Sequence, residues 1–424
     1  MSRPAILSTL LVLLLGLGVA LAITVPWTVL AGAHPSVQVA RDFTPAEVAR
    51  EVAYHAAVRP PAYASLVVGL LLAGLLGLTS TGGRLVAGVA RPLGGGWAWQ
   101  VLLGSFALAL LARIVTLPID VQTERVLRRY GLSTQSWGSW LLDAGKGLLV
   151  SSVLTGVVLL AVFGLVRLAP RTWWAWAAAV TAAFVLIGSF AYPLLVEPVF
   201  NSFSSLPAGP LRTDLLAMAA RDHVPVKDVL VADASRRTTS LNAYVSGFGS
   251  TRRVVVYDTL LRSASPAEVE LIVAHELGHA KRKDVLHGTL LGALGAAAGV
   301  CALALVLSWS GLLARVGATG PGDPRVIPLV LFLVAIASLL LAPATNLISR
   351  RIEARADVHS LDVTRSVPTF IASEQRLART NLSDLHPNPF LYAMFASHPS
   401  SPQRIALARE WARLHGVPSM SVPE

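Results

Sequence analysis

The sequence predicts a multi-pass α-helical membrane protein with a small α+β domain outside the bilayer. Hydrophobic residues make up 54% of the 424-residue chain and charged residues only 14%, whereas a soluble domain carries roughly 25% charged residues. The charges are unevenly distributed, because long stretches contain none. Two longer polar segments, 196–284 and 349–424, alternate with these stretches. This pattern is typical of membrane helices with attached polar segments.

Seven apolar runs are long enough to cross a bilayer, which takes about 20 residues of helix. The first run exceeds the 7–15 apolar residues that are typical of a signal peptide, so we expect it to be a span, although Ala31-Gly32-Ala33 resembles a cleavage site. The runs lie approximately at 5–31, 63–80, 97–119, 147–167, 172–195, 285–309 and 326–348. They divide the chain into 1–195 with five spans and an amphipathic inner loop, 196–284, 285–348 with two spans, and 349–424.

The distribution of Lys and Arg predicts the orientation. With the N-terminus outside, 27 of the 35 basic residues lie in inner segments and 7 in outer ones, and basic residues favour the cytoplasmic side. Both polar segments would therefore face the cytoplasm. In either orientation the last two spans form a hairpin, so 196–284 and 349–424 lie on one side and can form one domain. The net charge of +11 follows from these loops, and without a basic run interleaved with aromatic residues we expect no nucleic-acid partner.

The segment 196–284 reads as mixed α and β structure. Its β-branched runs Asp228–Val231 and Arg253–Tyr257 predict strands. Leu241–Val245, followed by Gly247-Phe248-Gly249, predicts a third strand and a turn. Ser265-Pro266-Ala267-Glu268 is a capping box that opens a helix.

Two further features lie in the N-terminal half. Thr44-Pro45-Ala46-Glu47 has the form of the same capping box and predicts a short amphipathic helix in the first inner loop. Arg113 falls inside the third span, where a charge must snorkel to an interface or face a wet interior.

The helix that begins near Ser265 contains His275-Glu276-Leu277-Gly278-His279. Histidines at i and i+4 lie on one helix face, so His275 and His279 can bind one zinc ion. Glu276, between them, can take a proton from a water that the metal acidifies. The alternative is a helix face with two incidental histidines, but unpaired His and Glu among apolar neighbours are costly. Other divalent metals also suit such ligands.

Catalytic zinc needs a third protein ligand, and Glu353, just after the seventh span, is the candidate. At 1.5 Å per residue, His279 and Glu353 each lie within about 8 Å of the membrane face, so the two can meet there. The alternative for Glu353 is a solvated flank of the span. Cys301 is the one cysteine, so a thiolate site is excluded.

Two further residues are candidates for the chemistry. Asp357, one turn beyond Glu353, can hold a ligand histidine by its second nitrogen, or it can form a surface salt bridge with a neighbouring Arg. His398 precedes a helix capped by Ser401-Pro402 and can stabilise the oxyanion of peptide hydrolysis, or it can be an exposed loop residue.

These motifs together resemble the type I CAAX prenyl endopeptidases, a family of zinc proteases with seven membrane spans. The resemblance covers residues from about 40 to 412. It rests on Tyr130-Gly131-Leu132-Ser133-Thr134-Gln135-Ser136-Trp137-Gly138, Pro198-Val199-Phe200-Asn201, Ser235-Arg236-Arg237, Asn242-Ala243-Tyr244, Val256-Tyr257-Asp258-Thr259-Leu260-Leu261, the His275–His279 helix, Glu353-Ala354-Arg355-Ala356-Asp357 and His398-Pro399.

The resemblance implies seven helices that enclose a water-filled chamber, a small zincin-like metalloprotease domain and one zinc ion per chain. It implies Glu353 as the third ligand, Asp357 as its helix partner and His398 as a transition-state contact. It further implies that Asn242 and Tyr244 lie on the strand that receives the substrate, and that a chamber explains Arg113.

Function is expected to be hydrolysis of a peptide or protein, lipidated or not, beside membrane lipids. The compact chain, rich in Ala, Leu and Arg, lacks long insertions, which suggests a prokaryotic member and leaves the substrate open. One alternative is a membrane-protein quality-control protease, although seven spans favour the first interpretation. Another is a non-hydrolytic chamber protein that binds a lipid or peptide, but a general base at Glu276 argues for catalysis.

Overall fold

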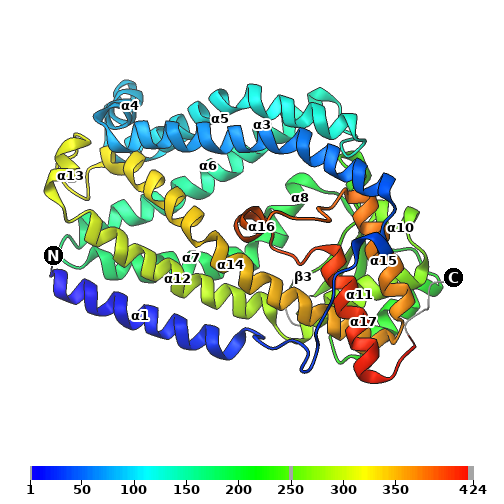
Figure 1. Cartoon of the computed structure of the whole chain (residues 1–424). Helices are drawn as coiled ribbons and strands as arrows, with labels where there is room; N and C mark the ends of the chain where they lie inside the picture. Colours follow the sequence, from blue (N-terminus) through cyan, green and yellow to red (C-terminus); the bar gives the residue numbers. More distant parts are fainter. Residues whose placement is uncertain (1, 248–251, 419–424) are drawn as a thin grey trace.

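The computed structural model describes residues 2–247 and 252–418, and it confirms the predicted multi-pass helical fold (Figure 1). Seven helices of the described residues are long and apolar enough to cross a membrane. They are α1 (Arg3–Thr24), α3 (Pro45–Leu78), α5 (Trp97–Arg129), α6 (Trp137–Leu168), α7 (Trp173–Leu195), α12 (Asp284–Val306) and α14 (Ile327–Thr364). Most of their side chains are not buried within the molecule, as expected of helices that face lipid or a wet interior.

Shorter helices connect the spans and build the polar segments. Those beside the spans are α2 (Val39–Asp42), α4 (Ser80–Ala90), α8 (Glu197–Phe200) and α13 (Ser310–Arg315). Those of the polar segments are α9 (Pro210–Arg221), α10 (Asp258–Ser263), α11 (Pro266–Lys281), α15 (Val367–Asn381), α16 (Pro389–Phe395) and α17 (Ser401–His415). In Figure 1, α10, α11, α15 and α17 gather at the end of the molecule opposite the N-terminus.

Three helix boundaries differ from the sequence prediction. The first helix ends at Thr24, earlier than the apolar run. The Thr44 capping box does form, but it opens α3 itself, which continues through Pro60 and Pro61 into the second span instead of forming a separate helix. Membrane helices tolerate such prolines. The seventh span continues past residue 348 to Thr364, because the following residues are mostly good helix formers such as Ala, Arg and Glu.

A four-stranded sheet has the order β1-β2-β4-β3. Its strands are β1 (Phe203–Ser205), β2 (Asp228–Ala232), β3 (Ala243–Ser246) and β4 (Arg253–Tyr257). Strands β2 and β4 are parallel, and β1 and β3 pair antiparallel to them. The sequence did not predict β1, which is short, and it placed the third strand two residues early; Phe248 and Gly249 of the expected turn lie outside the described residues.

The sheet and α11 share one hydrophobic core. Val254 and Val256 of β4 are buried in the same cluster as Val273 and Leu277 of α11. Strand β3 pairs only with β4 among the described strands, so it is an edge strand, and it lies against α11. The fold therefore sets an open strand edge beside the helix that carries the two histidines.

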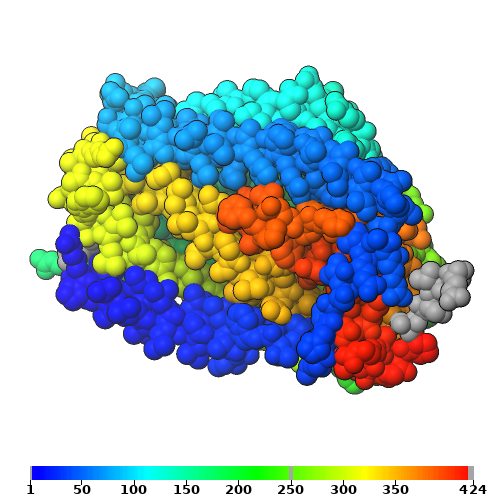
Figure 2. All heavy atoms as spheres, viewed as in Figure 1, coloured from blue at the N-terminus to red at the C-terminus, as the bar shows by residue number. Residues whose placement is uncertain are grey.

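Arg113 forms an ion pair with an acidic residue of the same helix. Its guanidinium lies 2.7 Å from the carboxylate of Asp120, two turns further along α5, and Ser65 of α3 donates to the same carboxylate at 2.8 Å. These residues line a cavity of about 660 Å³ among α3, α5, α6 and α14. Figure 2 shows a separate hollow on one face of the molecule, between α12 (yellow-green) and α14 (gold). Arg113 thus faces a cavity among the spans, which is one of the two settings expected for a charge within a span.

We expect Gly77→Ala to destabilise the protein at the α3–α14 crossing. A Cβ at Gly77 would lie 2.7 Å from Phe332 Cβ and 2.8 Å from the Pro328 carbonyl oxygen, so the helices must separate, at a cost of about 1–3 kcal/mol. Gly69→Ala is the control on the same helix, because nothing lies within 4 Å of its Cβ position. Thermal unfolding in detergent should show a lower Tm for Gly77→Ala alone; equal Tm values for the two variants would contradict the close packing.

Candidate metal centre

Helix α11 presents three functional side chains from a rigid, buried frame. It begins with the predicted Ser265–Glu268 capping box and with Pro266 at its first position. His275 is buried and Glu276 and His279 are partly exposed. Because the rest of the helix is packed against the sheet, these three side chains have fixed positions.

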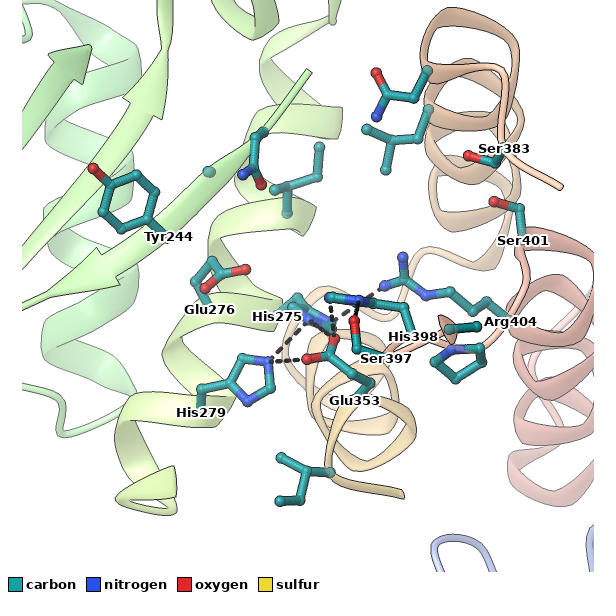
Figure 3. A pocket seen from close by; sticks show the side chains of 18 of the residues that line it. Tyr244, His275, Glu276, His279, Glu353, Ser383, Ser397, His398, Ser401 and Arg404 are labelled. Atoms are coloured by element: carbon teal, nitrogen blue, oxygen red, sulfur yellow. Dashed lines mark hydrogen bonds and ion pairs between the residues drawn. The ribbon is translucent and has the colours of Figure 1, made fainter. Parts of the chain in front are cut away.

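Helix α14 brings Glu353 to the same point (Figure 3). The Nε2 atoms of His275 and His279 are 3.2 Å apart. Glu353 Oε2 lies 3.2 Å from His275 Nε2, and its Oε1 lies 3.6 Å from His279 Nε2. The structure thus brings together the three residues that the sequence analysis selected as metal ligands, from both sides of the α12–α14 hairpin.

Each histidine has a carboxylate at its other ring nitrogen. Asp357 Oδ1 lies 2.9 Å from His275 Nδ1, and Asp284 Oδ2 lies 3.0 Å from His279 Nδ1. A carboxylate accepts hydrogen bonds, so in the neutral tautomer each Nδ1 carries the proton and donates. Both Nε2 atoms then carry lone pairs that face each other and the Glu353 carboxylate.

This donor set fits a divalent cation. The two Nε2 atoms lie 3.2 Å apart, and each lies 3.2–3.6 Å from a different oxygen of Glu353, so these electron-rich atoms repel unless a cation lies among them. Ligands at 2.0–2.1 Å from tetrahedral zinc are separated by about 3.3–3.4 Å, which agrees with the observed spacing. Two imidazoles and a carboxylate are also the ligand type of catalytic zinc sites.

Asp357 is held by a buried ionic network. It is fully buried, which excludes a surface salt bridge. Arg404 of α17 lies 2.9 Å from Asp357 through Nε and 2.7 Å from Glu374 of α15 through its Nη1. These contacts fix the carboxylate that orients His275, since buried charges are retained where they are paired and hydrogen-bonded.

Gly278 permits the close contact between α11 and α14. A Cβ there would lie 3.0–3.1 Å from the His359 side chain. His359 in turn contacts Asp222 at 2.8 Å, and Lys281 contacts the same carboxylate at 2.6 Å. Gly278 therefore lets α11 and α14 pack closely enough for the histidines of α11 to approach Glu353 of α14.

Glu276 and the edge of β3 face one large cavity. Its volume is about 1370 Å³, and Asn242, Tyr244, Glu276 and His398 contribute to its wall. Burial raises the pKa of Glu276 above its ordinary value, which suits a group that must both take and return a proton. Asn242 precedes β3 by one residue, whereas the sequence placed both Asn242 and Tyr244 on the strand.

His398 lies on the opposite side of the cluster from α11. Its Nε2 is 3.5 Å from Glu353 Oε2, and its side chain is 63% exposed. Its Nδ1 hydrogen-bonds to Ser397 Oγ at 2.9 Å. The helix after it is capped by Ser400, with a capping box to Gln403, so the sequence assignment of the cap to Ser401 was one residue late. His398 is therefore near enough to contact a substrate at the cluster.

Asp284, Arg404 and Glu374 also belong to the site, and the sequence did not predict them. Asp284 is the first residue of α12 and comes after Lys283, whose positive φ of 56° turns the chain back toward His279. Its signal was a carboxylate five residues after His279, at the start of a span. Arg404 and Glu374 lie in separate helices, so their sequence positions carry no sign of their contact with Asp357.

Two family models match the chain in succession. Residues 30–202 match the CAAX prenyl protease N-terminal region with five membrane helices, and residues 205–412 match peptidase family M48. An uncharacterized metalloprotease YhfN of Bacillus subtilis is 31% identical over 308 residues, which cover 72% of each chain. A CAAX prenyl protease 1 homolog of Oryza sativa is 29% identical over 304 residues, which cover 70% of each chain.

A solved structure has the same fold. The crystal structure of S. mikatae Ste24p superimposes with a TM-score of 0.76 and covers 96% of this chain and 99% of that chain. The sequence identity is 19%, so the comparison establishes the fold alone.

We expect Asp284→Asn to weaken metal binding without unfolding the protein. The amide can no longer fix the His279 tautomer, and loss of such a partner lowers metal affinity roughly 10–100-fold. Asp357→Asn should weaken binding similarly and also lower the Tm, because it leaves Arg404 short of a buried partner. Zinc affinity by chelator competition and Tm by thermal scan separate the two effects; unchanged affinity in Asp284→Asn would contradict its role.

Proposed function

Because the chain belongs to peptidase family M48 and is a membrane-embedded metallopeptidase, we propose that His275, His279 and Glu353 hold one catalytic zinc ion and that Glu276 is the general base. The observation that carries this proposal is the convergence of two imidazoles on Glu353: the two Nε2 atoms lie 3.2 Å apart, and each lies within 3.6 Å of one Glu353 oxygen. Family membership also favours hydrolysis over the non-hydrolytic chamber protein. Asp357 acts through His275 as a positioning residue.

The chemistry divides between the ion and the side chains. A zinc ion in this position supplies a Lewis acid for the scissile carbonyl and lowers the pKa of an adjacent water. Glu276 takes the proton of the attacking water and returns it to the leaving amine. His398 donates a hydrogen bond to the oxyanion that forms on the scissile carbonyl.

The substrate is an extended peptide that adds to the free edge of β3. Backbone groups of an edge strand pair with an added strand. Tyr244 on β3 and Asn242, which directly precedes β3, face the cavity. Both are proposed to contact the substrate strand. Substrates are peptides or proteins held at the membrane, and the name of the rice relative makes a prenylated C-terminal peptide the first class to test.

We propose that the catalytic segments 196–284 and 349–424 face the cytoplasm. Segment 1–195 contributes the first five spans, and 285–348, between the two catalytic segments, contributes the other two. The excess of Lys and Arg in the inner segments supports it. The last two spans return the chain to the side it left.

We expect Glu276→Gln to abolish peptide hydrolysis while the metal stays bound. Loss of a general base lowers kcat/KM by roughly 10²–10⁴-fold, whereas the ligands are untouched. The measurement is cleavage of quenched peptides by the full chain in detergent, with metal content determined in parallel. Glu270→Gln, on the same helix outside the cavity lining, is the matched control and should retain activity.

The same assay tests the substrate class. Each peptide is offered with and without a farnesylated cysteine, and a higher kcat/KM for the farnesylated form supports a prenylated substrate. Equal activity of Glu276→Gln and wild type would exclude Glu276 as the general base. If purified wild-type protein contained no divalent metal, the metal centre itself would be excluded.

Cysteine labelling tests the orientation. In a Cys301→Ser background, which removes the one native cysteine, Leu93→Cys places a thiol at the end of the molecule away from the metal centre and Arg262→Cys at the catalytic end. Both side chains are exposed. An impermeant maleimide should label Leu93→Cys in intact cells and Arg262→Cys only after permeabilisation; the reverse pattern would invert the topology.

A further inference from the structure

A second cluster of metal-binding side chains lies where α3 meets the loop between α15 and α16. Glu51 and His55, one turn apart on α3, face Asp384 of that loop. One donor atom from each of the three lies within 4.8 Å of the other two. His55 and Asp384 also line the large cavity, whereas none of the three belongs to the proposed catalytic centre.

The buried carboxylate of Glu51 is a second, independent observation at this cluster. It is only 4% exposed, and its Oε2 has no hydrogen-bond partner among the described residues. Its other oxygen, Oε1, lies 3.3 Å from His55 Nε2, so the carboxylate points into the cluster. A buried carboxylate oxygen without a partner is costly unless a proton or cation satisfies it.

The backbone adds a fourth donor. The Leu382 carbonyl oxygen accepts a hydrogen bond from His55 Nε2 at 3.0 Å; with the His55 proton on Nδ1 instead, the same spacing lets both atoms bind one small ion. Arg59 pairs with Asp384, and such a partner commonly supports a ligating carboxylate from behind. With His55 neutral, one guanidinium balances only one of the two carboxylates, which leaves room for positive charge.

We propose that Glu51, His55, Asp384 and the Leu382 carbonyl form a second divalent-cation site, separate from the catalytic centre. One imidazole with three oxygen donors suits a transition-metal ion such as Zn²⁺ or Mn²⁺. The ion replaces any proton on Glu51, and His55 ligates through Nε2 with its proton on Nδ1. It ties the membrane helix α3 to the loop that follows α15, and so braces one wall of the cavity.

Zinc content of the full chain tests the site. Protein in detergent is stripped with EDTA, equilibrated with a small excess of ZnCl₂, desalted and measured by elemental analysis. We expect two zinc ions per wild-type chain and one in Glu51→Gln. Glu353→Gln should also hold one, because it loses the catalytic ion, and the double variant none. Glu47→Gln is the control, since Gln preserves the capping box on the same helix and both ions should remain.

The outcomes separate the two metal sites. An unchanged zinc content in folded Glu51→Gln overturns the second site, whereas an unchanged content in Glu353→Gln overturns the catalytic one. If Glu51→Gln does not fold, Asp384→Asn takes its place in the same comparison. As a further measurement, ZnCl₂ should raise the Tm of Glu353→Gln, where only the second site remains, because an ion that binds the folded state stabilises it; no rise in Tm would overturn the proposal.

Discussion

The rest of the site depends on two hydrogen bonds, in which each histidine of α11 donates from Nδ1 to a carboxylate that fixes its tautomer. Asp357 and Asp284 hold the Nδ1 protons of His275 and His279, and so direct both Nε2 lone pairs at Glu353. Without them either imidazole could rotate or present an N–H to the ion. Because Asp284 begins α12 and Asp357 lies near the end of α14, the two helices of the membrane hairpin orient one histidine each.

That arrangement places the candidate centre where α12 begins and α14 approaches its end. Asp284 is the first residue of α12, and Asp357 lies in the C-terminal part of α14. Glu353 lies one turn before Asp357 on the same helix. Close approach of α14 to α11 is then required, and Gly278 provides it by leaving space for His359. Arg404 of α17 pairs with both Asp357 and Glu374 and so links α17 to α14 and α15.

The sequence predicts those features that depend on local pattern. Apolar runs locate all seven spans, and a capping box locates the start of α11. The box at Thr44 predicts a separate short helix, but it opens the long α3. The spacing of His275 and His279 selects the helix face. Features that depend on tertiary contact escape it: the turn at Lys283 that brings Asp284 to His279, and the pairing of Arg404 with residues of two other helices. Glu353 and Asp357 became specific candidates through family resemblance, since a charged flank after a span is common.

The most direct test of this account is to locate the metal in crystals of the full chain by anomalous diffraction above and below the zinc absorption edge. The account predicts a zinc peak bounded by His275 Nε2, His279 Nε2 and Glu353, with about 2.0–2.2 Å to each donor atom. A peak elsewhere with none at this point, or a peak that excludes Glu353 from the ligands, would contradict it.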